Sequence, residues 1–156
     1  MTTEGKNLSD FNPDEFPDLT GKKFGIVVSE WNHNITGNLL KGALQGFYDA
    51  GVLESDITIK YVPGAYELAL GALKLIERGN IDGVVCLGSV IRGETAHFDF
   101  VCQSAAQGIM EVNLKTGKPV AFGVLTDNNA QQAIDRSGGR YGNKGTEAAV
   151  VVMKMQ

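Results

Sequence analysis

Long apolar runs are absent from this sequence. No stretch of eighteen or more apolar residues occurs in the 156-residue chain, and its start, MTTEGKNLSDF, lacks the basic beginning and apolar middle of a secretion signal. We therefore expect no membrane contact and a cytosolic location. A chain of this length that is 43% hydrophobic and 21% charged is typical of one globular domain with a single core.

Cysteine and histidine are also scarce, with two of each in the chain. Cys86 lies in an apolar run and Cys102 on the apolar face of an expected helix, so we interpret both as small core residues rather than a disulfide pair or a redox site. His33 and His97 stand far apart, and neither CxxC nor HExxH spacing occurs. We expect neither a metal nor a cofactor.

Clusters of lysine or arginine are missing as well. Residues 1–20 hold five acids and one lysine, a net charge of −4 that equals the whole-chain value, so residues 21–156 are near neutral. Without a basic patch, nucleic-acid binding is not expected. Because residues 1–20 also contain Pro13 and Pro17, we interpret them as an irregular acidic arm that contacts a neighbour, followed by one α/β domain over residues 21–156.

The remaining chain alternates between strand and helix patterns. Apolar runs typical of buried strands occupy residues 24–30, 57–62, 82–88 and 119–126. Helical spacing of apolar residues runs from Leu39 to Gly51, from Leu68 to Gly79, from Phe98 to about Lys115, and over residues 130–136 and 146–155, the last two separated by the glycine-rich segment 137–145. The apolar faces include Leu70, Cys102 and Met110. This order predicts a four-stranded parallel sheet with helices on both faces.

A binding site is expected at the carboxyl ends of the strands, where open parallel sheets bind ligands. The segments that follow the four strands are chemically unusual: EWNHNIT (30–36), VPGAYE (62–67), SVIRGET (89–95) and LTDNN (125–129). Any one of them could simply form a turn. Four together favour a site, and we expect them to converge on one edge.

The segment after the third strand is the strongest candidate. Gly93, Glu94 and Thr95 are predicted at the free amide end of the following helix, which favours an anion, although Thr95 as a helix cap explains the same pattern. His97 falls in the first turn of that helix, where the dipole disfavours protonation, and a neutral imidazole beside an anion site can move protons. A lone histidine can equally be a surface or packing residue. Neither GxxxxGK[ST] nor GxGxxG occurs, which argues against nucleotide binding.

Two further residues have open interpretations. Trp31, the only tryptophan, could stack on a flat ring at the ligand edge or fill a gap in the core. His33 is predicted in a polar loop, with a structural or solvated role.

Four stretches resemble the signature segments of the 6,7-dimethyl-8-ribityllumazine synthase family: VPGAYEL (62–68), GSVIRGETAHFDFV (88–101), PVAFGVLT (119–126) and QQAIDRSGGRYGNKGTEAA (131–149). The resemblance runs from about Phe24 to near the C-terminus. It implies a flavodoxin-like three-layer sandwich that assembles as pentamers or as a sixty-subunit shell, with active sites between neighbouring subunits. It also implies inorganic phosphate as a ligand and riboflavin synthase as a candidate partner.

The resemblance implies a role for each of thirteen residues. It puts Trp31 on the pyrimidine ring, Ala65, Tyr66 and Glu67 on the ribityl chain, and the backbone of Val90 and Ile91 on the ring. It assigns phosphate to Glu94, Thr95 and Arg136, and proton transfer to His97. Phe122, Arg136 and Lys144 would come from the adjacent subunit, with Arg140 near the same place. Glu94 stands where many members have Ala, Ser or Gly, so its backbone amide is the group that suits an anion.

The implied reaction joins 5-amino-6-(D-ribitylamino)pyrimidinedione to 3,4-dihydroxy-2-butanone 4-phosphate. Imine formation, loss of phosphate and ring closure need positioning and one acid/base group rather than a metal. Two alternatives stay open: a module that retains a flavin or lumazine without turnover, and a structural shell protein. Arg136 and His97 favour the enzyme. The short segment 138–145 is like that of shell-forming relatives, whereas Pro13 and Pro17 remove backbone donors that could pair with a neighbouring pentamer.

Overall fold

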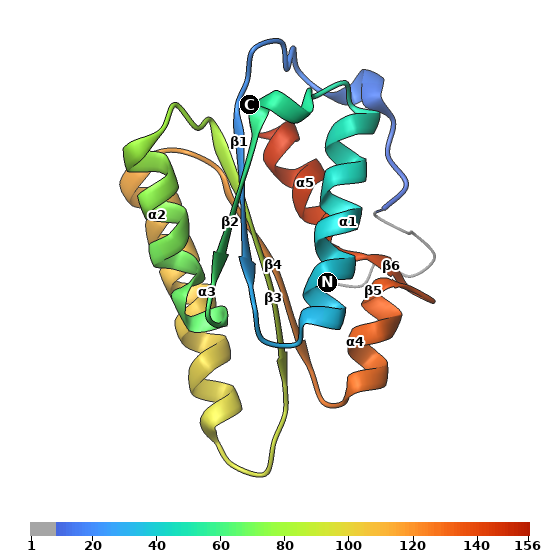
Figure 1. The fold of residues 1–156 in the computed structure, drawn as a ribbon, viewed down its shortest axis with the longest axis vertical. Coiled ribbons are helices and arrows are strands. Elements are labelled where there is room, and N and C mark those ends of the chain that lie inside the picture. The colour runs from blue at the N-terminus through green and yellow to red at the C-terminus, as the bar shows by residue number, and fades with distance from the viewer. Residues whose placement is uncertain (1–8) are drawn as a thin grey trace.

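The computed structural model describes residues 9–156 (Figure 1). Its main elements are β1 (Phe24–Ser29), α1 (His33–Asp49), β2 (Ile57–Val62), α2 (Leu68–Arg78), β3 (Gly83–Ile91), α3 (His97–Thr116), β4 (Val120–Asp127), α4 (Ala130–Arg136) and α5 (Lys144–Lys154). The smaller elements are the 3-10 helices η1 (Pro13–Glu15), η2 (Glu54–Asp56) and η3 (Ala65–Glu67), and the strands β5 (Ser137–Gly139) and β6 (Gly142–Asn143).

Strands β1 to β4 form one parallel sheet in the order β2-β1-β3-β4. Helices α1 and α5 cover one face, and α2 and α3 cover the other (Figure 1). This is the flavodoxin-like three-layer sandwich predicted from the sequence, so the fold prediction is confirmed. Because the chain leaves β1 toward β2 on one side and later adds β3 on the other, the strand order reverses between β1 and β3, where such sheets bind ligands.

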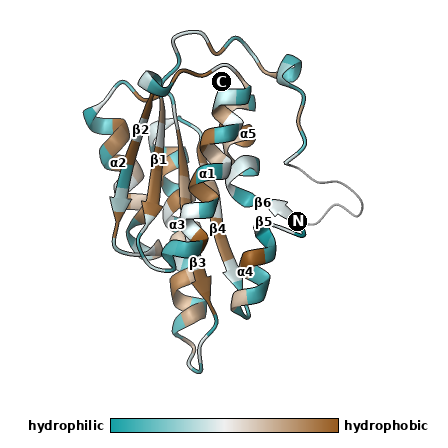
Figure 2. Cartoon of the chain, turned by 45° about the vertical axis from the view of Figure 1, so that its right-hand side comes forward, coloured by the Kyte–Doolittle hydropathy of each residue, from teal (hydrophilic) through white to brown (hydrophobic). Residues whose placement is uncertain are grey.

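The core lies on both faces of the two central strands. All six residues of β1 and the first seven of β3 are buried. Phe24 and Leu87 pack toward α1 and α5, and the rings of Phe24 and Phe47 lie 4.8 Å apart. Val27 and Cys86 belong to the second cluster, under α2 and α3. Strands covered on both faces must be apolar throughout, and Figure 2 shows the sheet largely in brown between helices with teal outer faces.

The helix α1 begins six residues before the apolar pattern suggested. Its first residue is His33, and Asn32 at the N-cap adopts a left-handed backbone with φ +57°. The first turn is mostly polar, so hydrophobic spacing could not reveal it. The prediction that His33 lies in a loop is therefore wrong, and its exposed side chain starts a helix.

The start of α3 also differs from the prediction. The N-cap is Ala96 and the helix begins at His97. Gly93, Glu94 and Thr95 therefore form the loop that leads to the helix rather than its free amide end. His97 does lie in the first turn, as predicted.

Some residues assigned to buried helix faces are not fully buried. Leu70 and Met110 are exposed, and Cys102 is half-buried. Leu70 lies two positions from buried Leu68 and Met110 one position from buried Ile109, and a step of 200° or 100° around a helix turns the side chain away from the sheet. Cys86 and Cys102 are both free thiols, in agreement with the prediction that they are not a pair.

The glycine-rich segment 137–145 forms a small antiparallel hairpin that the sequence did not predict. Gly138 and Gly142 have φ of +107° and +81°, so they supply the left-handed backbone that the turn requires. The side chain of Asn143 then accepts from the backbone N–H of Gly145 at 2.8 Å and donates to the carbonyl of Asn38 at 2.9 Å. These bonds cap α5, which begins two residues earlier than predicted, and tie it to α1.

The acidic arm is described from residue 9 onward, and residues 1–8 of the predicted arm lie outside the described part. From Ser9 to Thr20 it is irregular apart from η1. Phe16 and Leu19 pack against the core beside α1 and α5, and Glu15 forms an ion pair with Lys154 at 2.8 Å. The described part of the arm thus lies on its own domain, and a contact with a neighbour stays a prediction. No helix within residues 9–156 is long and apolar enough to cross a membrane.

Candidate active site

The four segments that follow the strands converge on one edge of the sheet, as predicted. The backbone N–H of Trp31, after β1, donates to the carbonyl of Pro63, after β2, at 3.3 Å. The side chain of Asn32 donates to the carbonyl of Ser89 on β3 at 2.8 Å. The backbone N–H of Arg92 donates to the carbonyl of Asp127, at the end of β4, at 2.9 Å. These bonds join each segment to its spatial neighbour.

Trp31 lies beside the turn that follows β2, with its side chain 73% exposed. Only 3.5 Å separates its Cδ1 atom from the place where a Cβ on Gly64 would stand, so the two segments lie side by side. Glu67 folds back over this turn, and its Oε2 accepts from the N–H of Gly64 at 2.9 Å. Tyr66 is also exposed, whereas Ala65 is buried. The alternative that Trp31 fills the core is wrong, because its ring is open to a ligand.

Arg92 shapes the loop between β3 and α3. Its guanidinium binds both carboxylate oxygens of Asp99, at 2.8 and 3.3 Å, and its Nε donates to Asn128 at 3.2 Å. The same group lies 4.1 Å above the ring centre of Phe98. Arg92 is therefore engaged within the chain, and it holds the loop against the first turn of α3 and the end of β4.

The loop itself presents its residues to solvent. Glu94, Thr95 and His97 are all exposed. The backbone N–H of His97 donates to the Oγ1 of Thr95 at 3.4 Å, so Thr95 caps the helix from one position before the N-cap. Val90 and Ile91, at the end of β3, are half-buried beneath the loop.

The other candidate residues form a second group on β4, α4 and the hairpin. Arg136 donates from Nη1 to the carbonyl of Gln132 at 3.1 Å, and its Cζ lies 5.1 Å from the ring centre of Tyr141. Arg140 lies over the same ring, with its Cζ at 5.2 Å. At the start of α5, Lys144 forms an ion pair with Glu147.

Phe122 is exposed on β4, one of the two edge strands of the sheet. The second group therefore includes an aromatic ring and cations that point away from the core. The two groups approach each other at Asp127, whose carboxylate lies 3.8 Å from Arg136 and whose carbonyl accepts from the N–H of Arg92. The helix α3, which carries His97, covers one face of the sheet, whereas α4, which carries Arg136, lies on the side of α1 (Figure 1). Within residues 9–156, neither a hydrogen bond nor an ion pair joins His97 to Arg136.

Asp127 is a site residue that the sequence reasoning missed. The residue is 6% exposed, its Oδ1 lies 3.8 Å from Nη1 of Arg136, and its Oδ2 has no hydrogen-bond partner in the described part of the chain. Burial raises the pKa of Asp127 above its ordinary value, and the charge of Arg136 opposes the shift. The only signal in the sequence was an acid in the segment after β4, among residues that usually form turns.

Asp127→Asn should therefore make the protein more stable at neutral pH, by about 1 kcal/mol in the free energy of unfolding, because the ionised carboxylate is poorly solvated. The folded-state pKa lies above the unfolded value, so the gain should be present above the folded-state pKa, shrink as the pH falls through it and vanish near 3.8. Urea unfolding followed by circular dichroism at several pH values measures this difference. A gain that grows toward acidic pH would contradict it.

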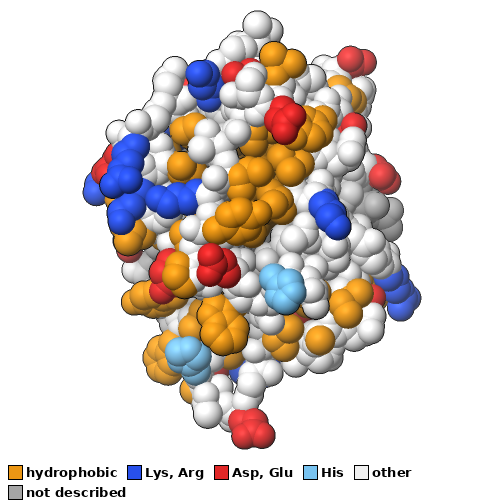
Figure 3. All heavy atoms as spheres, viewed as in Figure 1, with side chains coloured by type: hydrophobic (Ala, Val, Ile, Leu, Met, Phe, Trp, Pro, Cys, Tyr) orange, Lys and Arg blue, Asp and Glu red, His pale blue; other side chains and the backbone are white. Residues whose placement is uncertain are grey.

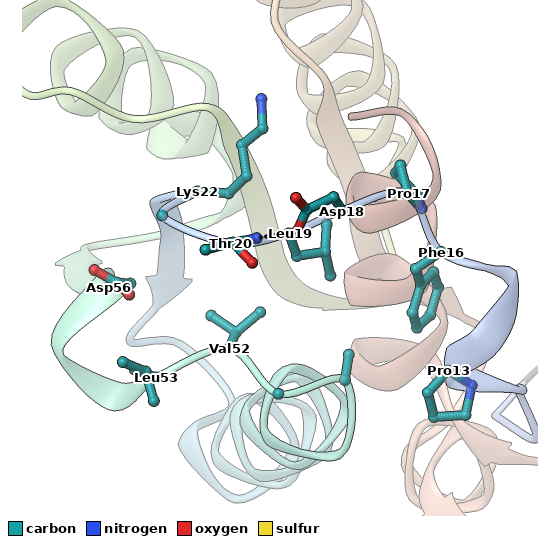
Figure 4. Close-up of a pocket in the computed structure, with 13 residues that line it drawn as sticks. Pro13, Phe16, Pro17, Asp18, Leu19, Thr20, Lys22, Val52, Leu53 and Asp56 are labelled. Carbon is teal, nitrogen blue, oxygen red and sulfur yellow. Dashed lines mark hydrogen bonds between the residues drawn. The ribbon is translucent and has the colours of Figure 1, made fainter.

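A hollow in the structure lies at the other end of the molecule from this edge. A cavity of about 410 Å³ lies between the arm and the loop after α1, lined among others by Phe16, Leu19, Lys22, Val52 and Asp56 (Figure 4). It borders the beginnings of β1 and β2, far from the carboxyl edge where the candidate residues gather. Within residues 9–156, no group of three or more His, Cys, Asp or Glu side chains could hold a metal ion.

Several known proteins are similar to this chain over nearly its whole length. The family model described as 6,7-dimethyl-8-ribityllumazine synthase matches residues 21–156. A protein of that name from Flavobacterium johnsoniae is 52% identical over 99% of this chain and 82% of its own length. Proteins of the same name from Cytophaga hutchinsonii and Phocaeicola vulgatus are 50% and 46% identical, over 99% of this chain and 97% and 92% of their own lengths. The chain belongs to the 6,7-dimethyl-8-ribityllumazine synthase family.

Proposed function

We propose that this chain condenses 5-amino-6-(D-ribitylamino)pyrimidinedione with 3,4-dihydroxy-2-butanone 4-phosphate, and so forms 6,7-dimethyl-8-ribityllumazine for riboflavin biosynthesis. The observation that carries the proposal is the convergence of the segments after β1, β2 and β3 on one edge of the sheet, where the strand order reverses. The reaction releases phosphate and water and requires no redox step.

The pyrimidine binds between the segments after β1, β2 and β3 in this proposal. The exposed ring of Trp31 stacks on the flat heterocycle. Tyr66 and Glu67, with the backbone at Ala65, bind the ribityl hydroxyls, and the end of β3 at Val90 and Ile91 offers main-chain groups to the ring edge. Glu67 is already held by its bond to Gly64, which orients one carboxylate oxygen before substrate arrives.

The butanone phosphate binds against the loop before α3. The backbone amides at Glu94 and Thr95 face an anion there, while the exposed carboxylate of Glu94 turns toward solvent. The guanidinium of Arg136 supplies a permanent charge for the phosphate before and after it leaves. His97, at the start of α3 beside this loop, takes a proton from the attacking amine and returns one as water or phosphate departs.

The site is completed by a neighbouring chain. One chain keeps His97 and Arg136 on different sides of its sheet, so a head-to-tail ring that brings the second group of one chain to the first group of the next would assemble all the roles. Phe122, Arg140 and Lys144 would then also reach the site from the neighbour. Several large apolar side chains are exposed on β2, α2 and α3: Ile59, Tyr61, Leu70, Phe100, Met110 and Leu114.

Figure 3 shows hydrophobic side chains gathered in a band on one face of the molecule. Exposed apolar area of this kind supports association with further copies of the chain. Because the family resemblance implies a pentamer, we propose that assembly here, and the short hairpin after α4 favours the larger shell of twelve pentamers. A partnership with riboflavin synthase stays a prediction.

The absorbance of a lumazine product tests the proposed reaction directly. With both substrates present, the enzyme should form the chromophore faster than the uncatalysed condensation does. A binding module would need the stacking ring of Trp31 and the carboxylate of Glu67 but could dispense with Arg136 and His97. A rate no faster than that without protein would exclude the enzyme and leave the binding or structural alternatives.

His97→Ala should lower kcat by roughly 10²-fold while substrate binding is largely kept, because positioned acid–base groups contribute on that scale and the amine is itself reactive. Arg78→Ala is a control, since Arg78 is exposed at the end of α2, away from the carboxyl edge of the sheet. It should stay within about twofold of the parent chain. Steady-state absorbance kinetics give both numbers. A loss of less than a few-fold in His97→Ala would return that residue to a structural role.

A further inference from the structure

The guanidinium of Arg136 is held on one side and open on the other. Its Nη1 is fixed by the carbonyl of Gln132 at 3.1 Å and lies 3.8 Å from the Oδ1 of Asp127. Within residues 9–156, its Nε and Nη2 have no hydrogen-bond partner, and about one-third of the side chain is exposed. An anion that arrives from solvent therefore meets two free donors, with Asp127 already on the opposite side.

Asp127 depends on Arg136 for charge compensation. The other charged groups nearby are occupied: Arg92, at the end of β3, binds Asp99 and Asn128, and Asp135 on α4 accepts from Gln131 at 2.9 Å. Arg136 on α4 is the one cation within residues 9–156 that forms an ion pair with Asp127. At 3.8 Å this pair is too long for a hydrogen bond, and the buried Oδ2 is left unpaired.

We propose that Asp127 is the resident counter-anion of Arg136 and weakens the hold of the site on phosphate, taking up a proton when phosphate binds. This inference rests on the proposed role of Arg136 in binding phosphate. Two anions then share one guanidinium, so each reduces the attraction felt by the other. Binding of one favours neutralisation of the other, which for a carboxylate means protonation.

The coupling between phosphate binding and protonation of Asp127 would help the site to release its product. Phosphate enters as part of the substrate and must leave as a free product, so a site that binds it too tightly would be inhibited by its own product. Burial already raises the pKa of Asp127, which brings its protonation closer to physiological pH. Ionisation of Asp127 after the elimination step would then help to expel phosphate.

Calorimetric titration of the assembled protein with inorganic phosphate tests the inference. At about pH 8, Asp127→Asn should bind phosphate roughly tenfold more tightly than the parent chain, because one buried negative charge near the anion has gone. The ratio of the two affinities should fall toward one as the pH is lowered through the raised pKa of Asp127, since Asp127 then becomes neutral in the parent chain too. Comparing the two proteins at each pH cancels the titration of phosphate itself.

Asp135→Asn is the matched control, because it removes the same charge from the residue next to Arg136 but leaves the ion pair intact. It should change phosphate affinity by less than about twofold. Equal tightening by both variants would mean a diffuse charge effect, and weaker binding by Asp127→Asn would mean that Asp127 only orients Arg136. Either result overturns the inference.

Two further measurements separate this inference from the proposed function. If Arg136→Ala leaves phosphate affinity unchanged, the proposed phosphate site is wrong, whatever Asp127 does. If Arg136→Ala abolishes binding but Asp127→Asn has no effect at any pH, the inference alone fails.

A second measurement does not depend on the assembly of Asp127→Asn. The heats of phosphate binding by the parent chain, measured in two buffers of different ionisation enthalpy, give the number of protons exchanged. A number of protons taken up that the titration of phosphate alone explains would also overturn the inference.

Discussion

Replacing Arg136 by alanine should lower kcat/KM for the butanone phosphate by roughly 10²- to 10³-fold, because two charge-assisted hydrogen bonds to the phosphate are lost together. The Michaelis constant for the pyrimidine should change far less, since that substrate carries no phosphate. Initial rates with each substrate varied in turn separate the two effects. Asp127 would lose its counter-ion in the same variant, so its assembly state should be verified before the kinetics are compared.

Two further variants define what Arg136 contributes. Arg136→Lys should recover only part of the loss, because an ammonium group cannot reproduce the planar fork. Arg78→Ala removes an exposed arginine from the end of α2, away from the carboxyl edge, and should leave both constants within about twofold. Equal weakening of both substrates by Arg136→Ala would place that residue outside the phosphate site.

The central part of the fold could be predicted because its strands and helices are marked by residues close together in the sequence. Strand β2 and helices α2 and α4 follow the predicted bounds, since runs such as ITIKYV end where turn residues begin and Gly79 stops α2. The start of α1 could not be predicted in the same way. His33 and its neighbours are polar, and Asn32 begins the helix through a left-handed backbone that no periodicity reports.

The sequence predicted the edge of the sheet at which the site lies, but not the side-chain contacts within the site. Parallel strands bring their carboxyl ends together by geometry alone, so the segments after the strands had to converge. That Arg92 would be bound to Asp99, and hence shape the loop rather than meet a ligand, depends on where α3 begins. The burial of Asp127 depends on α4 turning back over the end of β4, which is a tertiary event. Neither arrangement leaves a pattern in the sequence.

Two inactive variants should restore activity to each other if the site is shared between chains. One chain carries Arg136→Ala, and the other carries both Trp31→Ala and His97→Ala. In a head-to-tail ring, each interface presents a different surface of its two partners. After random co-assembly, about a quarter of the interfaces should pair an intact first surface with an intact second surface. Activity should return to about that fraction of the parent value, within the uncertainty of coupled mutants.

The mixed assembly distinguishes a site shared between two chains from a site formed within one chain. The expected gain in activity depends on which chain supplies which residue. The position of His97 on α3 and of Arg136 on α4, on different sides of one sheet, makes a site within a single chain difficult to build. A matched mixture, in which one chain carries all three substitutions and the other none, should also leave about a quarter of the interfaces intact. If mass spectrometry confirms co-assembly and the first mixture is no more active than its two parents, whereas the second retains activity, then Trp31, His97 and Arg136 act within one chain.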